Sequence, residues 1–193
     1  MAVNNYDEYK EILRGRLKEK RYIHSLAVAD EAERLAIKYG CDPEKAYLAG
    51  LLHDITKNTN PEEQLKILDS FGIMLDGISK NSQKLWHAVS GAAYIKYVLG
   101  INDNDIINAV RYHTTAKRDM TKFEAVLYLA DFTSRDRDYD DVDVMRELVN
   151  RSMEEAFEYA LSYTVCELVE KKSQIHPDTM DAYNQIVNKE ITF

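Results

Sequence analysis

Glycine and proline are scarce in this chain, and their scarcity limits the folds that it can adopt. The sequence holds seven glycines and three prolines in 193 residues, less than half of average usage. A sheet-rich fold of this size needs many tight turns, which these two residues usually supply. Alternating polar and apolar patterns also never persist beyond a few residues. The sequence therefore predicts an all-α protein.

Helix-start signals divide the chain into segments. Asp42-Pro43 and Asn60-Pro61 place a capping side chain before a proline at the first helical position, and Thr121 with Glu124 forms a capping-box pattern. The segment from Ala46 to Leu52 is apolar nearly all round, which is typical of a buried helix. The predicted helices cover about residues 5–20, 21–39, 43–52, 61–71, 82–100, 103–112, 122–131, 142–171 and 179–189.

Charge and cysteine content exclude several classes of protein. The net charge of −8 argues against a nucleic-acid-binding protein, because that affinity comes from many lysines and arginines on phosphates. Cys41 and Cys166 make no disulfide framework, the first ten residues do not resemble a signal peptide, and no apolar run is long enough to span a membrane. We expect a cytoplasmic protein that binds neither nucleic acid nor membrane.

Residues that could bind a metal recur beside apolar helical segments. His53 and Asp54 follow the apolar Leu51-Leu52, and Asp131 follows the apolar run 126–130. The other such residues are His24, His87 and His113. Mixed imidazole and carboxylate ligands suit iron, manganese, zinc and similar metals, whereas Mg²⁺ and Ca²⁺ prefer oxygen alone. A shared transition-metal site would explain why several buried helices each carry one such residue.

Other interpretations of these residues are less specific. A single histidine on an apolar helix is more often a hydrogen-bonded core residue than a ligand. The five aspartates within residues 136–143 are interpreted as a solvated loop without a metal role. Tyr159 and Tyr163 are interpreted as core or interface residues and not as a platform for stacking bases.

Five ordered segments resemble one family of enzymes. His24, His53-Asp54 and Asp131 resemble the H…HD…D signature of the HD-domain metal-dependent phosphohydrolases. The segments 21–26, 49–57, 112–115, 128–131 and 175–179 are more specifically similar to bacterial symmetrical bis(5'-nucleosyl)-tetraphosphatases of HD type (the YqeK family). The resemblance implies a single HD domain over residues 1–193. Its metal-binding core would cover about 21–135, with helices at about 142–190 completing a nucleotide pocket.

The resemblance also implies an activity and a cofactor. The reaction would be hydrolysis of diadenosine tetraphosphate into two ADP. Because a divalent ion lowers the pKa of bound water, we expect a hydroxide on the metal to attack an inner phosphorus. The cofactor would be iron, with manganese, cobalt or zinc as alternatives and with one or two ions. Three other functions stay open: another HD nucleotidase or deoxynucleotide phosphohydrolase, a non-catalytic nucleotide sensor, and a plain helical interaction protein. A homodimer stays open as well.

Site residues follow from the resemblance position by position. The implied metal ligands are His24, His53, Asp54 and Asp131, with His87 and His113 for a second ion. The implied catalytic residues are Asp54, Lys57, His87 and His113. Substrate contacts are implied for His24, Asp54, Lys57, His87, His113, Thr114, Asp131, Arg137, His176, Pro177, Asp178 and Thr179. The chain departs from the family pattern at Ser134 and Arg135, where glutamate and proline are usual, which bears on where the loop carrying Arg137 lies.

Overall fold

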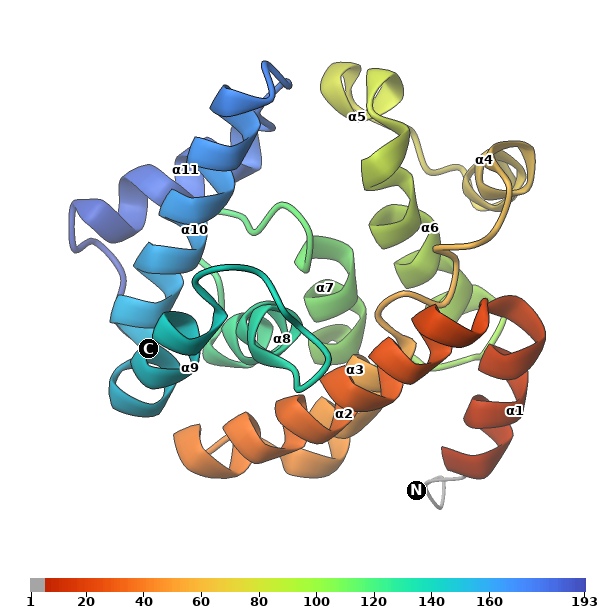
Figure 1. The fold of residues 1–193 in the computed structure, drawn as a ribbon. Helices are drawn as coiled ribbons and strands as arrows, with labels where there is room; N and C mark the ends of the chain where they lie inside the picture. The colour runs from red at the N-terminus through yellow and green to blue at the C-terminus, as the bar shows by residue number, and fades with distance from the viewer. Residues whose placement is uncertain (1–5) are drawn as a thin grey trace.

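The structure, a computed structural model, describes residues 6–193 and contains only helices and loops there (Figure 1). The start of the first predicted helix at Asn5 lies outside the described residues. The helices are α1 (Tyr6–Arg16), α2 (Glu19–Tyr39), α3 (Pro43–Leu52), α4 (Pro61–Ser70), α5 (Gly77–Asn81), α6 (Gln83–Tyr97), α7 (Asn104–Tyr112), α8 (Lys122–Thr133), α9 (Val142–Arg151), α10 (Met153–Glu170) and α11 (Pro177–Val187). The predicted all-α class is confirmed.

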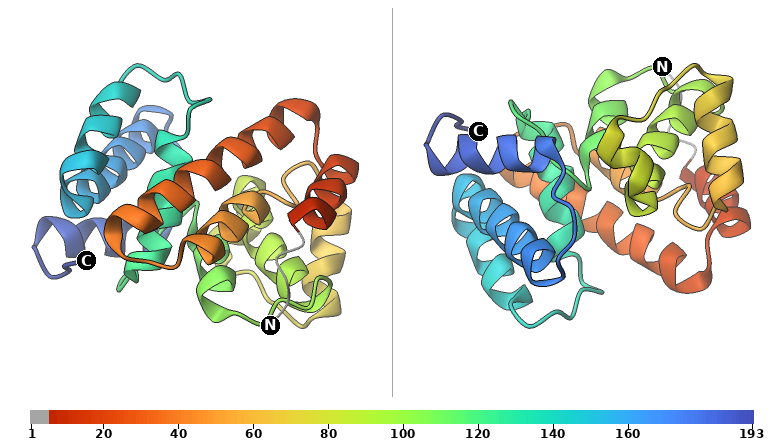
Figure 2. Two further views of the ribbon diagram at one scale, coloured as in Figure 1. Left: turned by 90° about the horizontal axis from the view of Figure 1, so that it is seen from below. Right: turned by 90° about the horizontal axis from the view of Figure 1, so that it is seen from above.

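Four helices form the centre of the molecule. Helices α2, α3, α7 and α8 pack against one another, and α2 runs beside both α3 and α8. Helices α4, α5 and α6 lie on one side of this centre, and α9, α10 and α11 lie on the other (Figures 1 and 2). Segments far apart in the sequence therefore meet along α2. None of the helices in residues 6–193 is both long and apolar enough to cross a membrane.

Side-chain caps start the helices where the sequence predicts them. Asp42 accepts a hydrogen bond from the Lys45 amide, and Asn60 accepts one from the Glu63 amide. Thr121 and Glu124 form both bonds of the capping box at α8. These local interactions set the point at which α3 and α8 begin, and hence where their site-bearing ends lie.

The prediction of one continuous helix over 142–171 is wrong, because the helix is interrupted at one residue. Ser152 has an extended backbone and separates α9 from α10, because its hydroxyl caps α10 by accepting from the Glu155 amide. The short α5 was not predicted either. Asp76 caps it through the amides of Ile78 and Ser79, and a five-residue helix leaves too little periodicity to recognise.

One glycine sets the distance between the two helices that carry His24 and His53. A Cβ atom on Gly50 of α3 would lie 2.7 Å from the Ala29 Cα and 2.9 Å from the Val28 carbonyl oxygen of α2. These are backbone atoms, so no side-chain rotation can relieve the clash. The absence of a side chain at Gly50 therefore lets α2 and α3 approach closely enough to share a site.

Replacement of this glycine should destabilise the protein. We expect Gly50→Ala to lower the free energy of unfolding by about 1–3 kcal/mol, because overpacking must push α2 and α3 apart. Gly15→Ala is the matched control, since Gly15 is exposed on α1 and no atom of the described residues lies within 4 Å of the added Cβ. The control should gain up to about 1 kcal/mol from helix propensity. Urea unfolding followed by circular dichroism measures both, and equal stabilities of the two variants would contradict this packing.

Candidate metal centre

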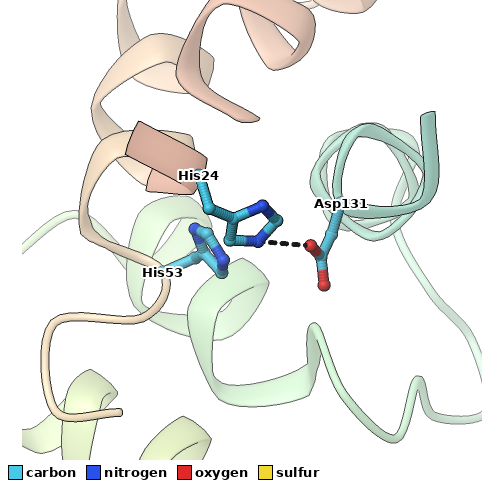
Figure 3. Close-up of side chains that lie close together, drawn as sticks. All are labelled: His24, His53 and Asp131. Atoms are coloured by element: carbon cyan, nitrogen blue, oxygen red, sulfur yellow. Dashed lines mark ion pairs between the residues drawn. The ribbon is translucent and has the colours of Figure 1, made fainter. Parts of the chain in front are cut away.

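The histidines and aspartates that the sequence singled out meet at the centre of the fold. His24 comes from α2, His87 from α6 and Asp131 from α8, while His53 and His113 are the C-cap residues of α3 and α7. The four histidines and Asp54 are all less than 5% exposed. Figure 3 shows His24 and His53 directed toward the carboxylate of Asp131.

Each of the four histidines is anchored through its Nδ1 atom. The Nδ1 atoms of His53, His87 and His113 lie 2.7, 2.8 and 2.7 Å from the carbonyl oxygens of Gly50, Lys84 and Val110 respectively. His24 Nδ1 lies 2.8 Å from the Asp136 carboxylate. Because a carbonyl oxygen only accepts, Nδ1 must carry the proton in the first three rings. In its neutral form each such ring directs the Nε2 lone pair into the site, which is how metal-ligating histidines are usually held.

The anchoring carbonyls at two of these histidines come from helix ends. Gly50 and Val110 lie in the last turns of α3 and α7, where carbonyl groups have no partner within the helix. The helix dipole places partial negative charge at the same ends. Both helices therefore favour a cation where their C-terminal histidines meet.

The four imidazole rings form a row. The ring centroids are 5.2 Å apart for His24 and His53, 5.1 Å for His53 and His113, and 5.0 Å for His113 and His87. Asp131 lies at the His24 end, with its Oδ1 atom 3.0 Å from His24 Nε2. The row thus has one end at Asp131 and the other at His87.

Ligand atoms along this row fall into two overlapping groups. His24, His53 and Asp131 form one, and His53, Asp54 and His113 form the other, with the ligand atoms of each group within 4.8 Å of one another. The ligand set implied by the resemblance is thus divided, because Asp54 groups with His113 and not with His24 and Asp131. His53 is common to both groups.

Three buried atoms in the site have no hydrogen-bond partner within residues 6–193. They are His24 Nε2, His53 Nε2 and Asp54 Oδ1. His87 Nε2 and His113 Nε2 lie 3.1 Å apart, and His87 Nε2 is 3.2 Å from Asp54 Oδ1. Buried acceptors that face one another are costly unless a proton or cation lies between them. The donor set is therefore chemically suited to a divalent transition metal.

Electrostatics keep both carboxylates ionised. Burial alone would raise the pKa of Asp54, but the facing rings of His53, His113 and His87 outweigh it and hold the pKa well below its usual range. Burial is outweighed at Asp131 too, where the Arg137 guanidinium and the facing histidines hold the pKa low. Both groups are therefore in the charged form that binds cations.

Lys57 lies at the His87 end of the row. Its Nζ atom is 3.0 Å from His87 Nε2 and 3.8 Å from Asp54 Oδ1. Burial lowers the pKa of Lys57, although the Asp54 charge opposes the shift, and burial also holds the pKa of His87 well below its usual range. The spacing of Asp54 and Lys57 would suggest one turn of a continued helix. Residues 53–58 form turns instead, and these turns bring Lys57 close to Asp54.

Thr114 contacts the same end of the row, beside a large cavity. Its hydroxyl lies 3.3 Å from His87 Nε2 and 3.2 Å from His113 Nε2. The cavity, of about 630 Å³, lies between the segments around α5–α6 and α10–α11 and is lined by Thr114, His176 and Thr179, among others. A cavity of this volume lies within the range of small-molecule sites.

The segment 176–179 is brought to the cavity only in part. His176 caps α11 and contacts Asp76 through Nε2 at 3.1 Å, while the Thr179 hydroxyl donates to the Thr115 carbonyl at 2.8 Å. Pro177 is exposed and, like Asp178, is not part of the cavity lining. Asp178 lies behind His176, with its carboxylate 3.5 Å from Nδ1.

Two charged residues of the site were not predicted from the sequence. Arg21 forms an ion pair of 2.7 Å with Asp54. Asp136, interpreted from the sequence as part of a solvated loop, orients His24. Asp136 was missed because it is one of five aspartates within residues 136–143, and its sequence context does not differ from that of the other four, which are exposed.

The departure from the family pattern has a local structural consequence. The Ser134 hydroxyl donates to Asp136 Oδ1 at 2.8 Å and so helps to hold the carboxylate that contacts His24. Arg135 is exposed and pairs with Asp30 at 3.1 Å. Arg137 still reaches the site and bonds to both the backbone and the carboxylate of Asp131.

Comparisons with known proteins agree with this geometry. Residues 21–147 match the HD domain family. The symmetrical bis(5'-nucleosyl)-tetraphosphatase of Bacillus subtilis is 33% identical over 184 residues, which cover 95% of this chain and 98% of that protein. The Staphylococcus aureus protein of the same name is 34% identical, with 93% of each chain covered. A crystal structure described as a predicted HD superfamily hydrolase involved in NAD metabolism, from Clostridium acetobutylicum, has a TM-score of 0.92 at 34% identity and covers 96% of this chain and 98% of its own.

Loss of the Asp136 carboxylate should weaken metal binding. Asp136→Ala leaves His24 Nδ1 without its acceptor, so we expect the affinity for a divalent metal to fall about 10- to 100-fold, the usual effect of removing such an orienting partner. Titration of the metal-free protein with Mn²⁺ or Zn²⁺ measures this directly. Asp138→Ala, which removes an exposed carboxylate two residues away, is the control. Wild-type affinity in Asp136→Ala would show that His24 needs no orienting group.

Proposed function

Because this chain belongs to the HD-domain family, and within it to the symmetrical bis(5'-nucleosyl)-tetraphosphatases, we propose that it hydrolyses diadenosine tetraphosphate into two ADP. The chain is thus a hydrolase acting on acid anhydrides. The observation that carries the proposal is the row of four Nε2 atoms, which meets two ionised carboxylates in the core of the domain.

The metal ligands are proposed from these donor atoms. His24, His53 and Asp131 would hold one ion. Asp54, His87 and His113, whose Oδ1 and Nε2 atoms lie 3.1 to 3.7 Å from one another, would hold a second when both are present, because the single Nε2 lone pair of His53 serves one ion. Iron is the proposed native metal, and manganese, cobalt and zinc fit the same mixed donors. A bound divalent ion lowers the pKa of coordinated water and polarises phosphoryl oxygens.

The residues around the metal would neutralise the polyphosphate chain. Lys57 lies at the His87 end of the row and Arg137 at the Asp131 end, so a phosphate chain laid along the row meets a cation at each end. Arg21, which is about a third exposed beside Asp54, adds a third positive charge. This local concentration of cations explains how a chain of net charge −8 can bind a tetra-anionic linker.

The reaction consists of one displacement at phosphorus. The oxygen of water forms a bond to one of the two central phosphorus atoms and loses a proton to solvent. The bond from that phosphorus to the central bridging oxygen breaks, and this oxygen leaves with the other ADP. Asp54 would orient the water, since its Oδ1 atom has no hydrogen-bond partner in residues 6–193. Lys57 Nζ holds a proton beside His87 Nε2 at 3.0 Å, so this pair can protonate the departing phosphate oxygen.

One nucleoside is proposed to bind in the cavity of about 630 Å³. Thr114 lies where the cavity reaches the row of histidines, and His176 and Thr179 lie farther along its wall. Asp178 would act through His176 and not touch the nucleotide, and Pro177 would start α11. The proposed compartment is the cytoplasm, where Cys41 and Cys166 stay reduced; a homodimer stays a prediction.

Substrate and product analysis tests the proposed function. We expect diadenosine tetraphosphate to yield ADP as the sole nucleotide product, with mononucleotides cleaved far more slowly. Release of AMP with ATP, or preferential hydrolysis of mononucleotides, would contradict symmetrical cleavage and favour a nucleotidase. Binding of nucleotide without hydrolysis by metal-loaded protein would favour a sensor instead.

The Lys57→Ala variant tests whether Lys57 acts on the phosphate chain or helps to hold the metal. The variant should retain its metal, because Lys57 donates no ligand, while kcat/KM falls by about 100-fold or more through loss of the proton donor and the positive charge. Lys66→Ala is the control, since Lys66 is exposed on α4. Elemental analysis and steady-state kinetics on the same preparations give both values. Loss of metal in Lys57→Ala would show that the role of this lysine is structural.

A further inference from the structure

Symmetrical cleavage bears on how many nucleosides the site can bind. Diadenosine tetraphosphate carries one nucleoside at each end, and symmetrical cleavage places the broken bond at its middle. A site that binds the whole substrate therefore needs a nucleoside pocket on each side of the metal centre. The cavity of about 630 Å³ supplies one of them, beside Thr114 and His87.

A second cavity lies at the opposite end of the row of histidines. It has a volume of about 280 Å³ and is lined by Asp131, Phe132, Arg137, Tyr139, Tyr163 and Glu167. Asp131 contacts His24 at 3.0 Å, whereas Thr114 contacts His87 at 3.3 Å. One cavity thus adjoins the Asp131 end of the row and the other the His87 end. Glu167 of α10 lines both cavities, so both lie along that helix.

Three aromatic rings form the wall of the second cavity. The Tyr139 and Tyr163 ring centroids are 5.2 Å apart, and Phe132 meets each of them edge-on at 6.5 Å. The Tyr139 hydroxyl donates to the Phe132 carbonyl at 3.1 Å, which fixes that ring. All three rings are half-buried, so they present apolar surface to the cavity while they stay packed against the protein.

The chemistry changes from charged to aromatic with distance from the metal centre. Arg137 bonds to Asp131 through Nε and Nη2, and a guanidinium carries five donors in all, so others can reach a phosphate. A volume slightly below the roughly 300–1,000 Å³ of whole-ligand pockets suits one planar ring system. Aromatic side chains bind bases of any sequence by stacking.

We propose that the cavity bounded by Arg137, Tyr139 and Tyr163 binds the base of the second nucleoside of a dinucleoside polyphosphate. The inference rests on the proposed function and deepens it, because it assigns the feature that separates a dinucleotide substrate from a mononucleotide. Tyr163 is a specificity residue in this account, in contrast to the core or interface role that the sequence indicated. Tyr139 holds the ring pair in place.

Adenosine 5'-tetraphosphate provides the matched probe, since it has the same four phosphates and lacks one nucleoside. Wild-type protein should show a higher kcat/KM for diadenosine tetraphosphate than for this probe. Tyr163→Ala should lower kcat/KM for the dinucleotide by about 5-fold or more, mainly through KM, since base–aromatic stacking is worth about that much or more. Turnover of the probe, whose nucleoside can use the larger cavity, should change less than 2-fold.

Two further variants keep the test specific. Tyr163→Phe should retain wild-type discrimination, because stacking needs the ring and not the hydroxyl. Tyr159→Ala removes a tyrosine one turn earlier on α10 that does not line the cavity, and it should keep the wild-type ratio of the two substrates. Thermal unfolding of each variant checks that the fold is retained.

Distinct results overturn the inference and the proposed function. Equal kcat/KM values for the two substrates in the wild type, with ADP formed from both, would leave the hydrolase in place and remove the second base site. An equal loss for both substrates in Tyr163→Ala would show a structural role and also overturn the inference. Absence of hydrolysis of both substrates by metal-loaded wild type would refute the proposed function, and the second base site with it.

Discussion

Each site histidine is oriented by a hydrogen bond from Nδ1 to an acceptor outside the site, and the metal centre could not form without these bonds. Three of the four bonds go to the carbonyl three residues earlier. Such a bond forms within a single helical turn, so it fixes the ring and its tautomer as soon as the local helix forms. The Nε2 lone pairs then face the site without help from distant residues. Only His24 uses a long-range partner, Asp136.

Helix packing brings these preset rings together. Gly50 lets α2 approach α3, which places His24 beside His53. Helices α3 and α7 both end at the site, so their dipoles favour the same positive charge that the carboxylates do. The same arrangement would repel a polyphosphate if no cation were bound. Metal, Lys57, Arg21 and Arg137 together would reverse the sign of the field in the centre of an acidic protein.

Much of this was predictable from the sequence because the signals are local. Caps at Asp42 and Thr121 and apolar runs before His53 and Asp131 are readable within a few residues, and they predicted the helical class and most of the residues that meet at the site. The division of the ligand atoms into two groups was not predictable, because it depends on how α2, α3, α7 and α8 cross. Asp136 and Arg21 were missed because a charged residue in a loop or on a helix surface looks the same whether or not it reaches a distant histidine or carboxylate. The break at Ser152 was missed because apolar periodicity continues through it.

These Nε2 atoms and carboxylates are proposed to hold a transition metal. Anomalous diffraction can detect that metal in crystals of protein purified without oxygen or chelator. Data would be collected on both sides of the iron absorption edge, and on both sides of the edges of manganese, cobalt and zinc. The account predicts an anomalous peak at about 2.1 Å from the Nε2 atoms of His24 and His53, with Asp54 or Asp131 completing the coordination, and with Nδ1 of each ring still bonded to its outer acceptor. An ordered site with no anomalous peak, or a metal bound through Nδ1, would contradict the account.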